Sequence, residues 1–328
     1  MKVSVVIPCF QEEKTIRPCL ESLLALDYAD DYEILVVENG STDRTADIVR
    51  DIQRRSPLVR LIDEAKRGTA AARNTGVRGA RFDHIAFVDA DCTVPPDWLS
   101  LLARSFDAAK STAGDLVAVG GRNIAPPQAA PFVKAIEIAL DSFAGSFNRV
   151  QGRQLRRPAF VSSLSLANAF FGRESILAVG GFDESLRSEA EDADLNFRLA
   201  EAGGKFLYVP DSYVWHNMRS SPKSWFRNMF RYGKGRARLL KRHRGMRHPV
   251  FLLPVVFLPA MLSVSLAWLS PVFLLPLLYF PLLGGLSLIQ AVTHRSTPLW
   301  PSIFLVYGLQ HFGYACGEVY GLLHPRVA

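Results

Sequence analysis

The chain has 328 residues, of which 49% are hydrophobic and 21% are charged. That balance excludes an intrinsically disordered chain, and 23 Gly and 20 Pro without a period exclude collagen-like and solenoid repeats. Thirty-eight Lys and Arg against 31 Asp and Glu give a formal net charge of +7, which suits either a nucleic acid or an anionic membrane.

The N-terminal part predicts strands and helices in alternation. Apolar runs at 3–7, 33–37, 58–62 and 85–88 predict strands, and the segments 12–26, 41–54 and 70–81 predict helices, the second capped by Ser41. Continuous apolar strands between helices favour a mostly parallel sheet covered on both faces, that is, a Rossmann-like three-layer α/β/α fold. Ligands of such sheets bind beyond the carboxyl ends of the strands.

Acidic residues stand at those strand ends. Glu12 follows the first strand, Glu38 ends the second, and Asp89 and Asp91 follow the fourth. One such pair of carboxylates is more often a polar strand end than a site. Three acidic strand ends at one edge of a sheet instead indicate a site, because paired carboxylates suit a hard divalent cation that keeps positions open for phosphate oxygens.

The segment 132–147 is amphipathic and predicts either a helix lying on a membrane or, the better interpretation, an ordinary surface helix. The regular strand and helix pattern returns over 165–209. The four Cys have no metal-ligand spacing and are interpreted as reduced thiols.

The C-terminal third has the composition of a membrane anchor. Ten Lys or Arg lie between Pro222 and His248, and no carboxylate occurs from Ser212 to Gly317. The apolar segments 250–268, 272–292 and 299–323 are each long enough to cross about 30 Å of hydrocarbon, although the first two could instead form a re-entrant hairpin. Among them, Gly284 and Gly285 are the one hint of helix packing through small residues.

A basic run directly before an apolar segment favours an anionic lipid surface over a nucleic acid. We therefore expect a cytosolic domain over 1–220, a basic juxtamembrane segment over 221–249, and a multi-pass anchor over 250–328 in the inner (cytoplasmic) membrane. The N-terminus enters a strand directly and lacks the apolar core of a signal peptide.

Several motifs together carry a family resemblance. They are VIPCFQEE at 6–13, VVENGSTD at 36–43, Arg73-Asn74, FVDAD at 87–91, GGFDE at 180–184 and Glu191-Asp192. In this order and spacing, over roughly the first 216 residues, they resemble the family 2 glycosyltransferases of the GT-A fold. The Q-x-x-R-W signature of processive synthases is absent, so the chain looks more like the membrane-anchored branch of succinoglycan-type exopolysaccharide enzymes. Glu38-Asn39 stands where the family often has Asp-Asp.

The resemblance implies roles for the matching residues. Pro8, Glu12, Glu38, Arg73 and Asp89 would line the donor nucleotide pocket, and Asp91, with Asp89, would bind Mn²⁺ or Mg²⁺. Asp192, next to Glu191, would be the catalytic base that removes the proton of the acceptor hydroxyl, and direct displacement would invert the anomeric carbon.

Three more residues are candidates for contacts with the diphosphate or the acceptor: Arg231, Arg236 and His216. The basic cluster as a whole is interpreted mainly as a face toward anionic lipid, and a lone His is more often structural.

The implied activity is the transfer of one sugar, a hexose, from a nucleotide diphosphate sugar to a polyprenyl-type lipid-linked acceptor at the cytoplasmic face, with a UDP-sugar as the expected donor. The alternatives are a polyprenyl-phosphate sugar transferase and, outside enzymes, a non-catalytic membrane scaffold on a degenerate GT-A fold.

Overall fold

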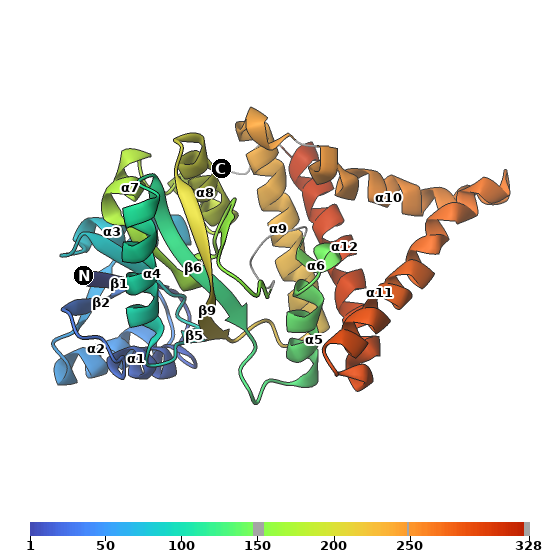
Figure 1. The fold of residues 1–328 in the computed structure, drawn as a ribbon. Coiled ribbons are helices and arrows are strands. Elements are labelled where there is room, and N and C mark those ends of the chain that lie inside the picture. Colours follow the sequence, from blue (N-terminus) through green and yellow to red (C-terminus); the bar gives the residue numbers. More distant parts are fainter. Residues whose placement is uncertain (147–153, 248, 325–328) are drawn as a thin grey trace. The chain divides into compact units, whose positions relative to one another are not determined.

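The computed structural model describes residues 1–146, 154–247 and 249–324. The chain divides into two compact units (Figure 1). The first comprises Met1–Pro126 and Arg149–Asn217, and the second comprises Pro127–Asn148 and Met218–Ala328. The expected domain of residues 1–220 therefore differs from the first unit mainly in the segment Pro127–Asn148, which belongs with the C-terminal part of the chain.

The first unit is built on one mixed sheet. Its strands are β1 (Val3–Cys9), β2 (Tyr32–Glu38), β3 (Val59–Asp63), β4 (His84–Phe87), β5 (Cys92–Thr93), β6 (Leu116–Ile124), β7 (Ala159–Val161), β8 (Ala169–Gly172) and β9 (Lys205–His216). Their order is β3-β2-β1-β4-β8-β6-β9-β5, and β7 pairs with β9.

The sheet is only partly parallel, which corrects the prediction. β1 to β4 pair in parallel as expected, and so do β6 and β9. β8 is antiparallel to both β4 and β6, and β5 and β7 are antiparallel to β9. The apolar pattern could not give the direction of β8, because Ala169–Phe171 are buried as fully as residues of a parallel strand.

Helices cover both faces of this sheet. The helices of the unit are α1 (Ile16–Leu24), α2 (Thr45–Arg55), α3 (Thr69–Gly79), α4 (Trp98–Thr112), α7 (Arg173–Ala178) and α8 (Glu191–Glu201). Alternate residues of a strand point to opposite faces. Val5 and Ile7 therefore pack with α1, α2 and α4, whereas Val6 and Phe87 pack with α3, α7 and α8. The predicted three layers are confirmed.

The N-terminus of α2 differs from the prediction. The helix begins at Thr45, and Ser41 does not cap it. The Ser41 hydroxyl instead accepts a hydrogen bond from the Gln11 backbone N–H at 3.0 Å, and the Ser41 N–H donates to the Glu38 carboxylate. The hydroxyl is thus used to join the ends of β1 and β2.

The second unit is helical. It contains α5 (Pro131–Leu140), α6 (Phe143–Ser146), α9 (Pro222–Arg242), α10 (Leu253–Ser263), α11 (Tyr279–Thr293) and α12 (Trp300–Leu323). The described part of the amphipathic stretch 132–147 ends at residue 146 and forms α5 and α6. Ile136 and Ala139 of α5 are buried in the core of this unit, and Ser142 bonds the Tyr307 hydroxyl at 2.7 Å. The segment 132–146 is therefore packed into the core of the second unit through α5.

α9 and α12 run side by side in the same direction (Figure 1). A Cβ on Gly317 would lie 1.9 Å from the Phe230 carbonyl oxygen, and a Cβ on Gly233 would lie 2.0 Å from the Tyr314 carbonyl oxygen. Gly313 and Gly321 lie one turn to either side of Gly317 against the same helix. Gly313, Gly317 and Gly321 of α12 are four residues apart, and together with Gly233 of α9 they let the two backbones come into contact. They were missed in the sequence, where only Gly284 and Gly285 were noted.

Within the described residues, one helical segment is long and apolar enough to cross a membrane: Pro271–Thr293, with a mean hydropathy of 2.1. The apolar helix Leu253–Leu266 is shorter. α12 has 24 residues but includes Gln310 and Glu318, both buried. Three membrane-crossing helices are therefore not confirmed, because the apolar helix in the first predicted span covers only Leu253–Leu266 and the third predicted span includes polar side chains.

Candidate active site

The acidic pair after β4 lies beside a histidine from the end of β9. β5 pairs with β9 so that Cys92 stands opposite His216. This pairing brings His216 Nε2 to 3.3 Å from Asp91 Oδ1, and the Asn217 N–H donates to the Asp91 carbonyl at 3.0 Å. Two segments 125 positions apart in the chain therefore form one polar cluster at the sheet edge where the sequence predicted a site.

These residues have the chemistry of a divalent-cation site. The candidate ligand atoms of Asp91, Cys92 and His216 all lie within 4.8 Å of one another. Burial raises the pKa of the Cys92 thiol well above its usual value, so the sulfur stays protonated and is a poor ligand. A cation would then bind a carboxylate oxygen of Asp91 and an imidazole nitrogen of His216, and its remaining positions would be open.

Arg73 of α3 links this edge to the start of α8. Its side chain is buried, with Nη2 3.0 Å from Asp89 Oδ1 and Nη1 2.9 Å from Glu191 Oε1. Desolvation would lower the pKa of Arg73, but Asp89 and Glu191 outweigh it, and the pKa is raised. The resemblance implied a place for Arg73 near the nucleotide; in the structure its two Nη atoms bind carboxylates.

Glu191 and Asp192 open α8, as the resemblance implied, but differ in exposure. The helix follows Ala190, whose φ of 67° lies in the left-handed region. Glu191 is buried, and burial raises its pKa to about 7 against the opposing effect of Arg73. Asp192 is only partly buried, and its Oδ1 accepts a hydrogen bond from the Ala193 N–H at 2.7 Å. Of these two carboxylates, Asp192 is therefore the more accessible.

The expected nucleotide residues lie at the ends of β1 and β2. Pro8 pairs in register with Val37. The N–H of Glu12 donates to Thr45 Oγ1 at 2.8 Å, which fixes the turn after β1. Partial burial would raise the pKa of Glu38, but hydrogen bonds from the N–H groups of Ser41 and Gly40 outweigh it, and the pKa is lowered. The Glu38 carboxylate thus stabilises the turn that follows β2.

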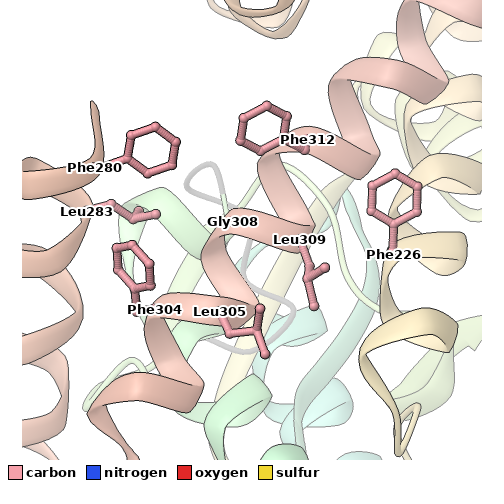
Figure 2. A pocket seen from close by; sticks show the side chains of 8 residues that line it. All are labelled: Phe226, Phe280, Leu283, Phe304, Leu305, Gly308, Leu309 and Phe312. Carbon is pink, nitrogen blue, oxygen red and sulfur yellow. The ribbon is translucent and has the colours of Figure 1, made fainter. Parts of the chain in front are cut away.

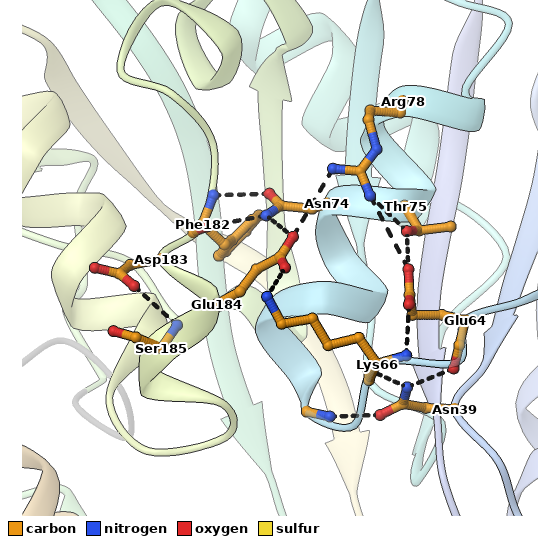
Figure 3. Close-up of polar contacts among 11 residues, drawn as sticks. Asn39, Glu64, Lys66, Asn74, Thr75, Arg78, Phe182, Asp183, Glu184 and Ser185 are labelled. Carbon is orange, nitrogen blue, oxygen red and sulfur yellow. Dashed lines mark hydrogen bonds and ion pairs between the residues drawn. The ribbon is translucent and has the colours of Figure 1, made fainter. Parts of the chain in front are cut away.

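Asn39 holds a second loop at this edge (Figure 3). Its side-chain amide donates to the carbonyls of Glu64 and Lys66 at 2.9 and 2.8 Å, and its Oδ1 accepts from the Gly68 N–H at 2.7 Å. The guanidinium of Arg67 in this loop lies 4.6 Å from the Phe10 ring. The sequence indicated a tight turn here but not this contact with the loop.

Asn74, next to Arg73, fixes the turn that precedes α8 (Figure 3). Its Oδ1 accepts from the Phe182 N–H at 2.8 Å, and its Nδ2 donates to the Phe182 carbonyl and to Glu184 Oε1, both at 2.9 Å. Glu184 also pairs with Lys66 Nζ at 2.5 Å. In the sequence, Asn74 and the Gly-Gly-Phe-Asp-Glu stretch are separate motifs. In the fold they are in direct contact.

Arg231 and Arg236 both belong to the second unit. Arg231 is exposed, and its Nη2 donates to Asn228 Oδ1 at 3.3 Å. Arg236 is 4% exposed; its Nε donates to the Tyr314 hydroxyl at 3.3 Å, and its guanidinium lies 4.6 Å from the Phe251 ring. Of the two, only Arg231 is exposed to solvent.

Comparison with known proteins agrees with this geometry. Residues 4–159 match the family model described as glycosyl transferase family 2, and residues 84–289 match that of glycosyl transferase family group 2. A succinoglycan biosynthesis protein, ExoA, of Rhizobium meliloti is 30% identical over 267 residues, which are 80% of this chain and 77% of that one.

A second relative is a dolichyl N-acetyl-glucosaminyl phosphate diacetamido-dideoxy-glucuronosyltransferase of Methanococcus voltae. It is 25% identical over 283 residues, 81% of this chain and 82% of that one. Among solved structures, a mannosyltransferase of Pyrobaculum calidifontis, in complex with GDP-mannose and Mn²⁺, superposes with a TM-score of 0.56 at 20% identity, over 94% of this chain and 86% of that one. That likeness supports the GT-A fold.

Proposed function

Because the chain belongs to the family 2 glycosyltransferases, we propose that it transfers one sugar from a nucleotide diphosphate sugar, with UDP as the expected nucleotide, to a lipid-linked acceptor in glycan or exopolysaccharide biosynthesis. The observation that carries the proposal is the Arg73 bridge between Asp89 and Glu191. It fixes the strand end that bears the cation residues against the helix start that bears Asp192.

Asp91 and His216 would hold a divalent cation, with Asp89 beside it. When bound, the cation supplies positive charge to the diphosphate oxygens of the leaving group. The mixed oxygen and nitrogen donor set favours Mn²⁺ over Mg²⁺, because Mg²⁺ prefers oxygen ligands in an octahedron. The Mn²⁺ in the Pyrobaculum mannosyltransferase complex supports the same choice.

Asp192 would accept the proton of the acceptor hydroxyl. A hydroxyl is a weak nucleophile and needs a positioned base as it attacks the anomeric carbon. Glu191 is turned inward onto Arg73 and acts as a positioning residue. With Asp192 as the single base, direct displacement by the acceptor hydroxyl would invert the anomeric carbon.

A membrane-bound acceptor is supported by the second unit. Large apolar side chains are exposed all along its apolar segment, among them Leu253, Val256, Leu262, Trp268, Leu275, Leu282 and Ile289. Exposed apolar surface of this extent is typical of contact with lipid. With the basic helix α9 it supports an enzyme whose second unit lies in the inner membrane as a multi-pass anchor and whose first unit is cytosolic.

The nearest alternative, a polyprenyl-phosphate sugar transferase, would use the same donor residues and differ only in its acceptor. The Methanococcus relative is named for transfer to a sugar that is already lipid-linked, which favours glycan extension. A non-catalytic scaffold is disfavoured by the partly buried, intact set of Asp91, His216 and Asp192.

The test is sugar transfer by the full chain in lipid nanodiscs. UDP-sugars and GDP-sugars labelled in the sugar would be supplied with Mn²⁺ and with polyprenyl phosphate or polyprenyl diphosphate-linked sugars. We expect label in a lipid-linked glycan with inverted anomeric configuration by NMR, and none with Asp192→Asn. Label on polyprenyl phosphate itself would select the alternative enzyme, and label nowhere would reject the proposal.

A further inference from the structure

The second unit contains a cavity of about 310 Å³ among three helices (Figure 2). All eight residues that line it are apolar: Phe226 of α9, Phe280 and Leu283 of α11, and Phe304, Leu305, Gly308, Leu309 and Phe312 of α12. Its volume lies at the lower end of the range of about 300–1,000 Å³ found for ligand pockets. It is therefore large enough for a short stretch of hydrocarbon chain.

Gly308 is the smallest of the residues that line this cavity. Gly313, Gly317 and Gly321 of the same helix are required by the close approach of α9, since a Cβ there would meet atoms of α9. A Cβ on Gly308 would meet nothing within 4 Å. A side chain at position 308 would therefore extend into the cavity without meeting another part of the chain at its Cβ.

The cavity adjoins a cationic stripe on α9. At about 100° per residue, seven basic residues of this helix fall within an arc of about 100°. They are Lys223, Arg227, Arg231, Lys234, Arg238, Lys241 and Arg242. Phe226 borders the stripe, because Lys223 precedes it by three residues, a spacing that places side chains next to each other. An apolar cavity beside fixed positive charge matches an amphiphile with an anionic head and an apolar tail.

We propose that this cavity binds the phosphate-proximal part of the isoprenoid chain of the acceptor lipid, and that Lys223 and Arg227 bind its phosphate. The inference rests on the proposed function, which supplies a lipid-linked acceptor, and adds where that lipid is held. The methyl branches of an isoprenoid fill a wide cavity lined by four phenylalanines better than a straight acyl chain does.

The test measures binding of undecaprenyl phosphate to the detergent-purified full chain by native mass spectrometry. Gly308→Leu places a side chain in the cavity, and Gly285→Leu is the matched control, because a Cβ there also meets nothing within 4 Å but Gly285 does not line the cavity. We expect Gly308→Leu to weaken binding about tenfold, equivalent to about 1.4 kcal/mol, and Gly285→Leu to leave it unchanged. Gly308→Ala is the smaller change if the leucine variant fails to fold.

Equal binding by the Gly308 and Gly285 variants would overturn the proposal. So would phosphatidylglycerol binding as strongly as undecaprenyl phosphate with the same dependence on Gly308, which would make the cavity a phospholipid site. Lys223→Glu with Arg227→Glu should weaken binding of the phosphate but not of undecaprenol. Donor binding is measured separately: binding of a nucleotide sugar without Gly308-dependent lipid binding rejects this inference alone, and the reverse pattern rejects the proposed function alone.

Discussion

The guanidinium of Arg73 joins Asp89 and Glu191, with contacts of 3.0 and 2.9 Å from its two Nη atoms. The two carboxylates come from segments about a hundred residues apart in the sequence. Removal of Arg73 would leave the buried carboxylate of Glu191 without its cation, and breaking a buried ion pair in this way is strongly destabilising. The bridge therefore makes the strand end that bears Asp89 and the start of α8 depend on each other.

Arg73→Lys should keep the charge and lose the fork that reaches both carboxylates. We expect transfer to fall by at least about tenfold while the fold persists, whereas Arg73→Ala should destabilise the first unit by about 3–5 kcal/mol. Transfer rates and thermal unfolding by circular dichroism give the two readouts. Arg78→Lys, exposed on the same helix, is the matched control. Equal losses of transfer activity in the two lysine variants would show that the bridge has no special role in transfer.

His216→Ala should weaken Mn²⁺ binding to the nucleotide-free protein, because His216 Nε2 lies 3.3 Å from Asp91 Oδ1. We expect a loss of about 10- to 100-fold, the range for loss of a single ligating or supporting group. Electron paramagnetic resonance of free Mn²⁺ measures the affinity directly. His84→Ala, at the opposite end of β4, is the control. Unchanged Mn²⁺ affinity in His216→Ala would assign His216 a structural role.

Asp192→Asn should abolish proton acceptance and leave the donor site intact. We expect nucleotide binding to be retained and transfer to fall by about 100-fold or more. The comparison is with Asp183→Asn, whose carboxylate accepts a hydrogen bond from the Ser185 N–H at 2.9 Å. Near-normal turnover of Asp192→Asn would move the base to another residue.

Asn74→Asp keeps the acceptor for the Phe182 N–H but replaces the two donated hydrogen bonds with a second carboxylate beside Glu184. We expect the turn before α8 to loosen, so that kcat falls while the affinity for the nucleotide is kept. Activity should recover in part at low pH, where protonation restores a donor. A fall in nucleotide affinity equal to the fall in kcat would indicate general unfolding instead.

The ionised carboxylate of Glu38 should stabilise the fold at neutral pH. Its pKa is lowered in the folded chain from a value of 4.5, so its contribution is complete above pH 4.5 and is lost as the pH falls through the folded pKa. Glu38→Gln should therefore be less stable than wild type at neutral pH, with a difference that shrinks below pH 4.5. Unfolding followed by tryptophan fluorescence at several pH values tests this, with Glu174→Gln on α7 as the exposed control. A difference that is constant with pH would contradict it.

The sequence predicts the first four strands and their helices closely, because short continuous apolar runs bounded by turns are typical of buried strands. It also predicts the acidic strand ends. It does not predict that β5, only two residues long, sets Cys92 opposite His216, because a strand so short has no pattern of its own. The contact between Asn74 and Phe182 is hidden for a related reason: it joins helix α3 to a loop residue 108 positions further along the chain, and the loop has no periodicity.

In the C-terminal part, composition indicates apolar helices but not how they pair. Gly313, Gly317 and Gly321 become a packing surface only when α9 lies parallel to α12. Arg236 was grouped with the basic cluster from its charge, but its position on the helix turns it away from the cationic stripe and into the interior. The side of the helix on which Arg236 lies, rather than its charge, decides that its side chain is buried.

The most direct test of the account is nucleotide binding by the detergent-purified full chain, with and without Mn²⁺, for wild type and Asp91→Asn. UDP, GDP and CDP would be titrated by isothermal calorimetry. The account predicts Mn²⁺-dependent binding of a nucleoside diphosphate, with UDP preferred, that is lost in Asp91→Asn. Absence of nucleotide binding under all conditions, or equal binding by the variant, would contradict it.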